Sequence, residues 1–119
     1  MAFQLRGIDP KSYGGGLIRF NVWTWHRIWL GLSEIDKDLT KSFSLWYANS
    51  GQIVDEKSAI KMAEAISHFG YGQFARLATN KVTELQQHAV SPQTLVAALE
   101  FEIDPLIIFL NECGGFKIT

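Results

Sequence analysis

Cys113 is the single cysteine of the chain and the first candidate for a nucleophile. A cysteine becomes reactive where its surroundings lower the pKa of the thiol. Cys113 shares a helical stripe with Leu106, Phe109 and Leu110, and it falls at the expected C-terminal end of a helix, where the dipole disfavours a thiolate. We therefore expect a buried structural cysteine. One cysteine also excludes an internal disulfide framework.

The three histidines, His26, His68 and His88, are widely spaced along the chain. A zinc site needs several His, Cys or carboxylate ligands gathered together, and one cysteine supplies no thiolate pair. We therefore expect no metal site. His26 lies between apolar positions and is expected to be half-buried and hydrogen-bonded, whereas His68 follows Glu64 by four residues and can form a surface pair with it.

Glu100, Glu102 and Asp104 alternate with apolar residues. In an extended segment they would project to one side, and paired carboxylates can perform acid–base catalysis or bind calcium. No Ser or His motif accompanies them, and Asp104 precedes Pro105 as a helix cap does. A solvated acidic face is therefore the better interpretation.

Gly14, Gly15 and Gly16 resemble a phosphate-binding loop in composition only. Neither Lys-Ser nor Lys-Thr follows, and Leu17-Ile18 predicts extended chain where a phosphate loop requires the start of a helix. We expect a flexible loop, no cofactor and no enzymatic activity.

The composition indicates one globular domain. The chain has 119 residues, of which 47% are hydrophobic and 19% charged, which places it outside the disordered class. A net charge of −1 argues against general affinity for nucleic acid or for anionic membranes. The chain shows neither a signal-like start nor an apolar run of the ~20 residues that span a membrane, so a cytoplasmic protein is expected.

The periodicity predicts a mainly α fold with minor β structure: a compact bundle of about five helices with short N- and C-terminal extended segments. Residues 1–20 form the extended and loop segment, and residues 21–119 form the helical core. Asn21 and Asp55 are expected N-caps, and Gly70 is an expected helix stop. Helices are expected from Asn21 to about Leu32, at about 38–48, 56–69 and 73–88, from Ser91-Pro92 for one or two turns, and from Asp104-Pro105 to Cys113, with extended chain at 101–103 and 116–118.

The helix that begins at Asn21 is apolar over about twice the ~100° stripe of an ordinary surface helix. Such a helix is either central in the fold or half of an interface. We predict interaction residues at Trp23, Arg27 and Leu30, because aromatic and arginine side chains are enriched in interface cores. The broad apolar face consists of Val22, Trp25, Ile28, Trp29 and Leu32, with Trp23 and Leu30 on its flanks. The narrow polar strip consists of Thr24, Arg27 and Gly31.

The helices at 56–69 and 73–88, joined by a glycine-containing turn of about three residues, have the outline of a helix-turn-helix. The outward face of the second helix carries side chains able to read bases and hold phosphates. Glu84 on the same face and the near-neutral chain argue against this reading, because phosphate contacts supply most of the affinity. The predicted nucleic-acid face is Gln73, Arg76, Asn80 and Thr83, with Thr79 and Gln87 beside it.

Four segments follow one another in a distinctive order. They are Asn21-Val22-Trp23-Thr24-Trp25, Asn49-Ser50-Gly51-Gln52-Ile53, Ala59 to Ile66, and the C-terminal stretch from Phe109 to Ile118 with its Cys-Gly-Gly-Phe element. This order resembles that of a group of small uncharacterised bacterial proteins over most of residues 21–118. The resemblance implies no activity and transfers no catalytic residue. It implies that the C-terminal element docks on the core, with the two glycines turning Phe116 inward.

The leading hypothesis is a non-enzymatic interaction module that associates with itself as a homodimer or with a protein partner. The first alternative is a helix-turn-helix nucleic-acid binder, disfavoured by charge. The second is a small-molecule pocket walled by Trp and Phe side chains. No membrane partner is expected.

Overall fold

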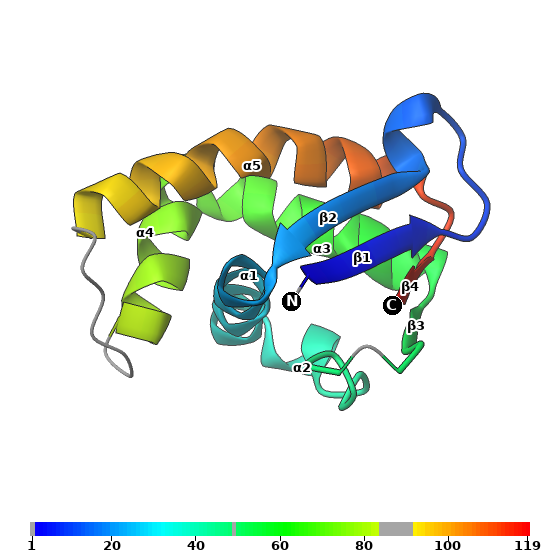
Figure 1. Cartoon of the computed structure of the whole chain (residues 1–119), viewed down its shortest axis with the longest axis horizontal. Helices are drawn as coiled ribbons and strands as arrows, with labels where there is room; N and C mark the ends of the chain where they lie inside the picture. The colour runs from blue at the N-terminus through cyan, green and yellow to red at the C-terminus, as the bar shows by residue number, and fades with distance from the viewer. Residues whose placement is uncertain (1, 49, 84–91) are drawn as a thin grey trace.

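The computed structural model describes residues 2–48, 50–83 and 92–119, without the side chains of residues 81–83 and 92. In Figure 1, α5 runs along the upper edge, α1 is seen nearly end-on in the middle, and α2 lies at the lower edge. The helices are α1 (Val22–Ile35), α2 (Lys37–Thr40), α3 (Glu56–Phe69), α4 (Tyr71–Thr83) and α5 (Pro92–Glu112), with a short 3-10 helix η1 (Tyr13–Gly15). The strands are β1 (Ala2–Gly7), β2 (Leu17–Asn21), β3 (Ile53–Val54) and β4 (Phe116–Ile118). The prediction of a mainly α fold with minor β structure is confirmed.

The four described strands form one antiparallel sheet in the order β2-β1-β4-β3. Phe3 pairs with Phe20 and Leu5 pairs with Ile118, so that these large apolar side chains share the buried face. Gly114 and Gly115 have φ of 66° and 88°, a conformation open to glycine, and the chain then returns to bury Phe116 completely. The predicted extended segments at both ends are confirmed.

Local capping starts the two clearest helices where the sequence predicts. The side chain of Asn21 accepts a hydrogen bond from the Thr24 amide at 2.8 Å, and Asp55 accepts one from the Ser58 amide at 3.1 Å. Gly70, with φ of 103°, ends α3, and α4 begins at the next residue. Both caps and the stop are therefore confirmed, while α4 starts two residues earlier than predicted.

The predicted helix at 38–48 is wrong beyond α2, because residues 41–48 form successive turns. Their backbone groups have partners that a helix would not allow. The indole Nε1 of Trp25 donates to the carbonyl of Trp46 at 2.8 Å, and the amide of Leu45 donates to the side chain of Gln52 at 3.2 Å. Turn bonds to the residue three positions back, as from Trp46 to Phe43, and these two longer-range bonds therefore take the place of helical bonds to the residue four positions back.

The predicted break at 101–105 is also wrong, because α5 continues through Pro105. Proline inside a helix costs about 3 kcal/mol, since it removes an amide donor and clashes with the preceding turn. Burial of Ile103, Leu106, Phe109 and Leu110 on the inward side of α5 offsets this cost. The alternating carboxylates at 100, 102 and 104 consequently do not lie on one side.

The buried side chains of the sheet and the helices form one hydrophobic cluster. Within it, α4 packs against both α1 and α5, α3 packs against α5, and η1 packs against the C-terminal half of α5. Among the described helices, we found none with the length and apolar character needed to cross a membrane.

Candidate functional site

Cys113 follows the end of α5 and is fully buried, as predicted. Its Sγ donates to the carbonyl of Leu110 at 3.6 Å, and burial raises the pKa of the thiol. A buried thiol that stays protonated has neither the charge nor the access that a nucleophile needs.

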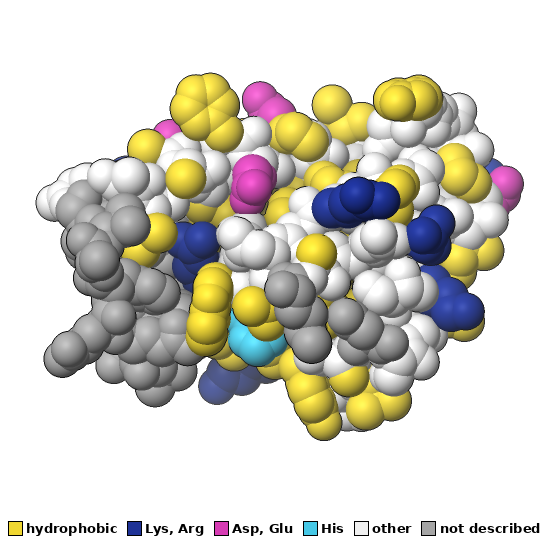
Figure 2. Space-filling model, viewed as in Figure 1, with side chains coloured by type: hydrophobic (Ala, Val, Ile, Leu, Met, Phe, Trp, Pro, Cys, Tyr) yellow, Lys and Arg dark blue, Asp and Glu magenta, His cyan; other side chains and the backbone are white. Residues whose placement is uncertain are grey.

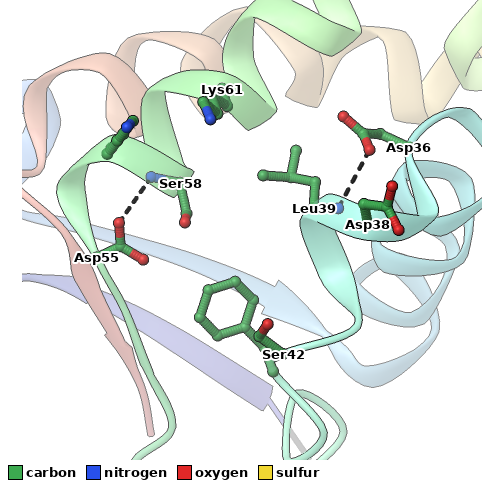
Figure 3. Close-up of a pocket in the computed structure, with 9 residues that line it drawn as sticks. Asp36, Asp38, Leu39, Ser42, Asp55, Ser58 and Lys61 are labelled. Carbon is green, nitrogen blue, oxygen red and sulfur yellow. Dashed lines mark hydrogen bonds between the residues drawn. The ribbon is translucent and has the colours of Figure 1, made fainter.

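A polar cleft of about 430 Å³ lies between α2 and the N-terminal turn of α3 (Figure 3). Asp36 and Asp55 each point to the start of their own helix, where Asp36 accepts from the Leu39 amide at 3.2 Å and Asp55 caps α3. The hydrogen bond from Ser58 lowers the pKa of Asp55, so it is ionised and has no proton to give. The residues that line the cleft are Asp36, Asp38, Leu39, Ser42, Phe43, Asp55, Lys57, Ser58 and Lys61.

The residues that line the cleft do not include a histidine beside a hydroxyl. Its hydroxyls, those of Ser42 and Ser58, have no histidine among the lining residues to take up a proton. Across the part of the chain that the structure describes, no three His, Cys, Asp or Glu side chains are placed to hold a metal ion. We therefore assign Asp36 and Asp55 to helix capping, while Asp38 forms an exposed ion pair with Lys41.

The glycine segment at 14–16 forms part of η1 and is not the free loop that we expected. A side chain at Gly15 would collide with the backbone of Glu112, and one at Gly7 would collide with the carbonyl of Gly15. These glycines thus allow η1 to lie directly on the end of α5.

The three predicted interaction residues of α1 do not share one surface. Trp23 is 45% exposed and Leu30 is half-buried, whereas Arg27 is only 7% exposed. Arg27 Nη2 donates to Thr24 Oγ1 at 3.1 Å, and burial lowers the pKa of the guanidinium against the opposing effect of Glu102. Arg27 therefore belongs to the interior.

The polar strip of α1 faces inward because α4 approaches it closely. An added Cβ at Gly31 would lie 3.0 Å from the Cβ of Ala78 and 3.0 Å from Cε1 of Phe74. A side chain at this position would have to displace Ala78 or Phe74 slightly. Thr24, Arg27 and Gly31 are all buried on this side of α1.

Exposed and half-buried rings continue from Trp23 along one edge of the molecule, which we call the aromatic edge: Trp23, His26, Trp46 and Tyr47. Successive ring centroids are 6.5, 5.0 and 5.9 Å apart. His26 Nε2 is buried without a hydrogen-bond partner among the described residues, which corrects our expectation, and burial lowers the pKa of His26.

The predicted nucleic-acid face is interrupted by α5. Gln73, Arg76 and Asn80 are exposed on α4, but Thr79 is fully buried. Arg76 and Asn80 border a groove of about 370 Å³ between α4 and α5, whose other lining residues are Gln93, Val96, Ala97 and Glu100. We call it the α4–α5 groove. The side chain of Thr83, and residues 84–88 of the predicted helix with His88, lie outside the described part.

The outer face of α5 is an apolar surface that the sequence analysis did not predict. Beside the polar Thr94 and Asp104 it carries Ala97, Ala98, Phe101, Pro105 and Ile108, all exposed. Phe101 is 85% and Ile108 52% exposed, and Tyr13 of η1 extends the apolar surface beyond the end of α5. Figure 2 shows hydrophobic side chains along the upper edge of the molecule, over α5 and η1. Because we expected extended chain at 101–103, the common face of Phe101 and Ile108, seven residues apart, went unpredicted.

The comparisons with protein-family models, with curated proteins and with solved structures found no match for this chain.

Proposed function

We propose that this chain is a non-enzymatic protein-interaction module that associates with itself. The observation that supports this proposal is the outer face of α5, where Phe101 and Ile108 are exposed to water beside the small apolar side chains of Ala97, Ala98 and Pro105. The inward side of α5 is apolar as well, because it packs in the core. Exposed apolar side chains that share one face of a helix in this way mark interaction sites.

The two alternative functions have less support. A nucleic-acid contact through Arg76 and Asn80 would bring a phosphate backbone against Glu100, which lines the same groove. A pocket walled by aromatic side chains is disfavoured, because Trp25, Trp29 and Phe43 pack against one another with ring centroids 5.5 to 6.2 Å apart.

Self-association is tested by sedimentation velocity across a wide range of protein concentration. We expect the mass to rise from the monomer value of 13.4 kDa toward twice that value. A mass that stays at 13.4 kDa at the highest concentration would contradict the proposal.

Two matched variants locate the contact. We expect Phe101→Ser to weaken association, because it removes the most exposed ring of α5. Trp23→Ser, on the aromatic edge, should associate like the wild type. The reverse result would move the contact to the flank of α1.

A further inference from the structure

The outer face of the sheet, over the strand residues that the structure describes, carries three cations and no carboxylate. Arg6 on β1, Arg19 on β2 and Lys117 on β4 are all exposed. Among the described residues, none of the three forms an ion pair with a carboxylate. In Figure 2, dark blue side chains gather over β1, β2 and β4, with no magenta side chain between them. On a chain with a net charge of −1, this face is a local positive patch.

The strand pairing arranges two of these cations and two apolar side chains in one line across the sheet. Arg6 pairs with Leu17 on β2 and with Lys117 on β4, and Lys117 pairs with Ile53 on β3. We call these four residues the cross-strand row. It follows the order apolar, cation, cation, apolar over three strand spacings of about 4.8 Å, a length of about 14 Å. Arg19 lies diagonally from Arg6 and adds a third cation beside the row.

This arrangement of charges is unfavourable in the free chain. Like charges directly opposite one another on neighbouring strands destabilise a sheet, and Arg6 and Lys117 have these positions. The carboxylates that follow β1 and β3 in sequence are engaged elsewhere, because Asp9 pairs with Lys11 at 2.6 Å and Asp55 caps α3. A bound group with negative charges would relieve the repulsion between the two cations.

The surroundings of the cations favour a protein segment over a nucleic acid. The row ends at Leu17 and Ile53, which are 42% and 54% exposed. Apolar side chains of a protein would cover these two residues, whereas phosphate groups would leave them in water. The exposed side chains of the described strands include no aromatic ring, so unpaired bases would find nothing to stack on.

We propose that the outer face of the sheet binds an acidic amphipathic helix of a partner protein, which lies across the strands along the cross-strand row. An α-helix advances about 5.4 Å per turn, close to the spacing of about 4.8 Å between strands. Side chains one turn apart on the helix therefore meet successive positions of the row. The stripe that fits is apolar, acidic, acidic, apolar, with the carboxylates against Arg6 and Lys117.

The proposal goes beyond self-association and does not depend on it, because the outer face of α5 takes no part in it. The two surfaces call for different partners. The sheet face lacks the carboxylates that would make it complementary to itself, so charge complementarity assigns it to an acidic partner of another kind.

A designed peptide tests the stripe. The probe is a labelled helical peptide of about 18 residues, long enough to form a helix in water when rich in alanine. Leucine stands at the first and twelfth positions of its stripe and glutamate at the fifth and eighth. We expect it to bind the full chain with a micromolar dissociation constant in fluorescence anisotropy, and more weakly as sodium chloride is added.

Two matched peptides separate this stripe from general stickiness. Replacing both glutamates with glutamine should weaken binding roughly tenfold or more, because the contacts with the two cations are lost. Exchanging the leucines and glutamates, so that the acidic positions lie outside, keeps the composition and should also weaken binding. Equal binding of all three peptides would overturn the proposal.

Charge reversals place the contact on the sheet. Arg6→Glu and Lys117→Glu should each weaken binding of the glutamate peptide roughly tenfold or more. Each also removes the like-charge pair across β1 and β4, so both variants should unfold at urea concentrations close to that of the wild type. Arg76→Glu on α4, which packs against α1, α3 and α5, makes the same change in net charge and should bind like the wild type.

A DNA duplex of mixed sequence tests the other class of partner. We expect it to bind more weakly than the glutamate peptide at the same salt concentration. Tighter binding of the duplex, lost in the Arg6 and Lys117 variants, would overturn the proposal in favour of a nucleic-acid surface. Peptide binding that survives both reversals, or no peptide binding at low salt, would overturn it as well. None of these results changes the test of self-association, which concerns α5.

Discussion

Helices α1 and α5 are both apolar around most of their circumference, yet the fold covers them in opposite ways. The sheet, the turns at 41–48 and α4 surround α1 so fully that even Thr24 and Arg27 are buried. In contrast, α3, α4 and η1 cover only one side of α5, and Phe101 faces water. The apolar content of a helix therefore does not by itself predict whether the helix is exposed. Exposure depends on which other elements pack against it.

The covering of α1 buries a guanidinium, whereas α5 places only the half-buried carboxylate of Glu102 on its inward side, where burial raises the pKa of that carboxyl. Desolvation of Arg27 disfavours its charge, and its Nη1 has no hydrogen-bond partner among the described residues. Hydrogen bonds from Nη2 to Thr24 and from Nε to the carbonyl of Trp23 at 3.4 Å offset part of this cost. The buried side of α5 is instead almost wholly aliphatic and aromatic.

The largest effect is expected from a comparison of two phenylalanines on α5. Phe109 is fully buried and Phe101 is 85% exposed. Phe109→Ala should lower the free energy of unfolding by about 3–5 kcal/mol, because it opens a cavity in the core. Phe101→Ala should change it by less than about 0.5 kcal/mol when urea denaturation is followed in dilute protein. Equal losses would show that the outer face of α5 is covered within the monomer.

An intermediate effect is expected where α1 meets α4. Gly31→Val would place a branched side chain 3.0 Å from atoms of Ala78 and Phe74. We expect the free energy of unfolding to fall by about 1–3 kcal/mol, since the two helices must separate. Gly16→Ala is the control, because its added Cβ would meet only the carbonyl of Tyr13 at 3.6 Å and its φ is −80°. If the Gly31→Val variant is as stable as this control, α4 can move away from α1 at little cost in free energy.

The smallest effect concerns His26 on the aromatic edge. Burial lowers the pKa of His26 in the folded chain, so the unfolded chain binds more protons as the pH falls through the ordinary histidine range. The free energy of unfolding should therefore fall between about pH 7.5 and pH 5.5, by less than about 1 kcal/mol from this partly exposed residue. In urea denaturation at both pH values, His26→Phe should show a smaller difference. An unchanged difference would mean that His26 does not contribute.

Local chemistry is what made parts of this fold predictable. The caps at Asn21 and Asp55 and the stop at Gly70 depend on side chains and φ values within a few residues, and all three occur where expected. The burial of Cys113 followed from its stripe of apolar neighbours. The order of the strands in the sheet, by contrast, depends on pairings between distant segments that periodicity does not encode.

The errors have a common physical origin in contacts across the fold. Pro105 is tolerated inside α5 because the residues after it are buried by other elements, and the turns at 41–48 replace a helix because Trp25 takes the carbonyl of Trp46. Arg27 was grouped with the exposed Trp23 because periodicity does not show that α4 approaches α1 closely at Gly31 and covers that side of the helix. The outer face of α5 was missed for the same reason, because a helix predicted to break at 101–105 has no continuous face on which Phe101 and Ile108 could be placed together.

The position of β4 between β1 and β3 has a consequence for the order of folding. Gln4 and Thr119 exchange backbone hydrogen bonds of 3.0 and 2.8 Å across 115 positions of sequence. During synthesis, β3 cannot join the sheet until residues 116–118 have left the ribosome, because β4 is its bridge to β1. Closing so long a loop is slow and entropically costly, so we expect the helices and the β1–β2 pair to form before β4 and β3 join the sheet.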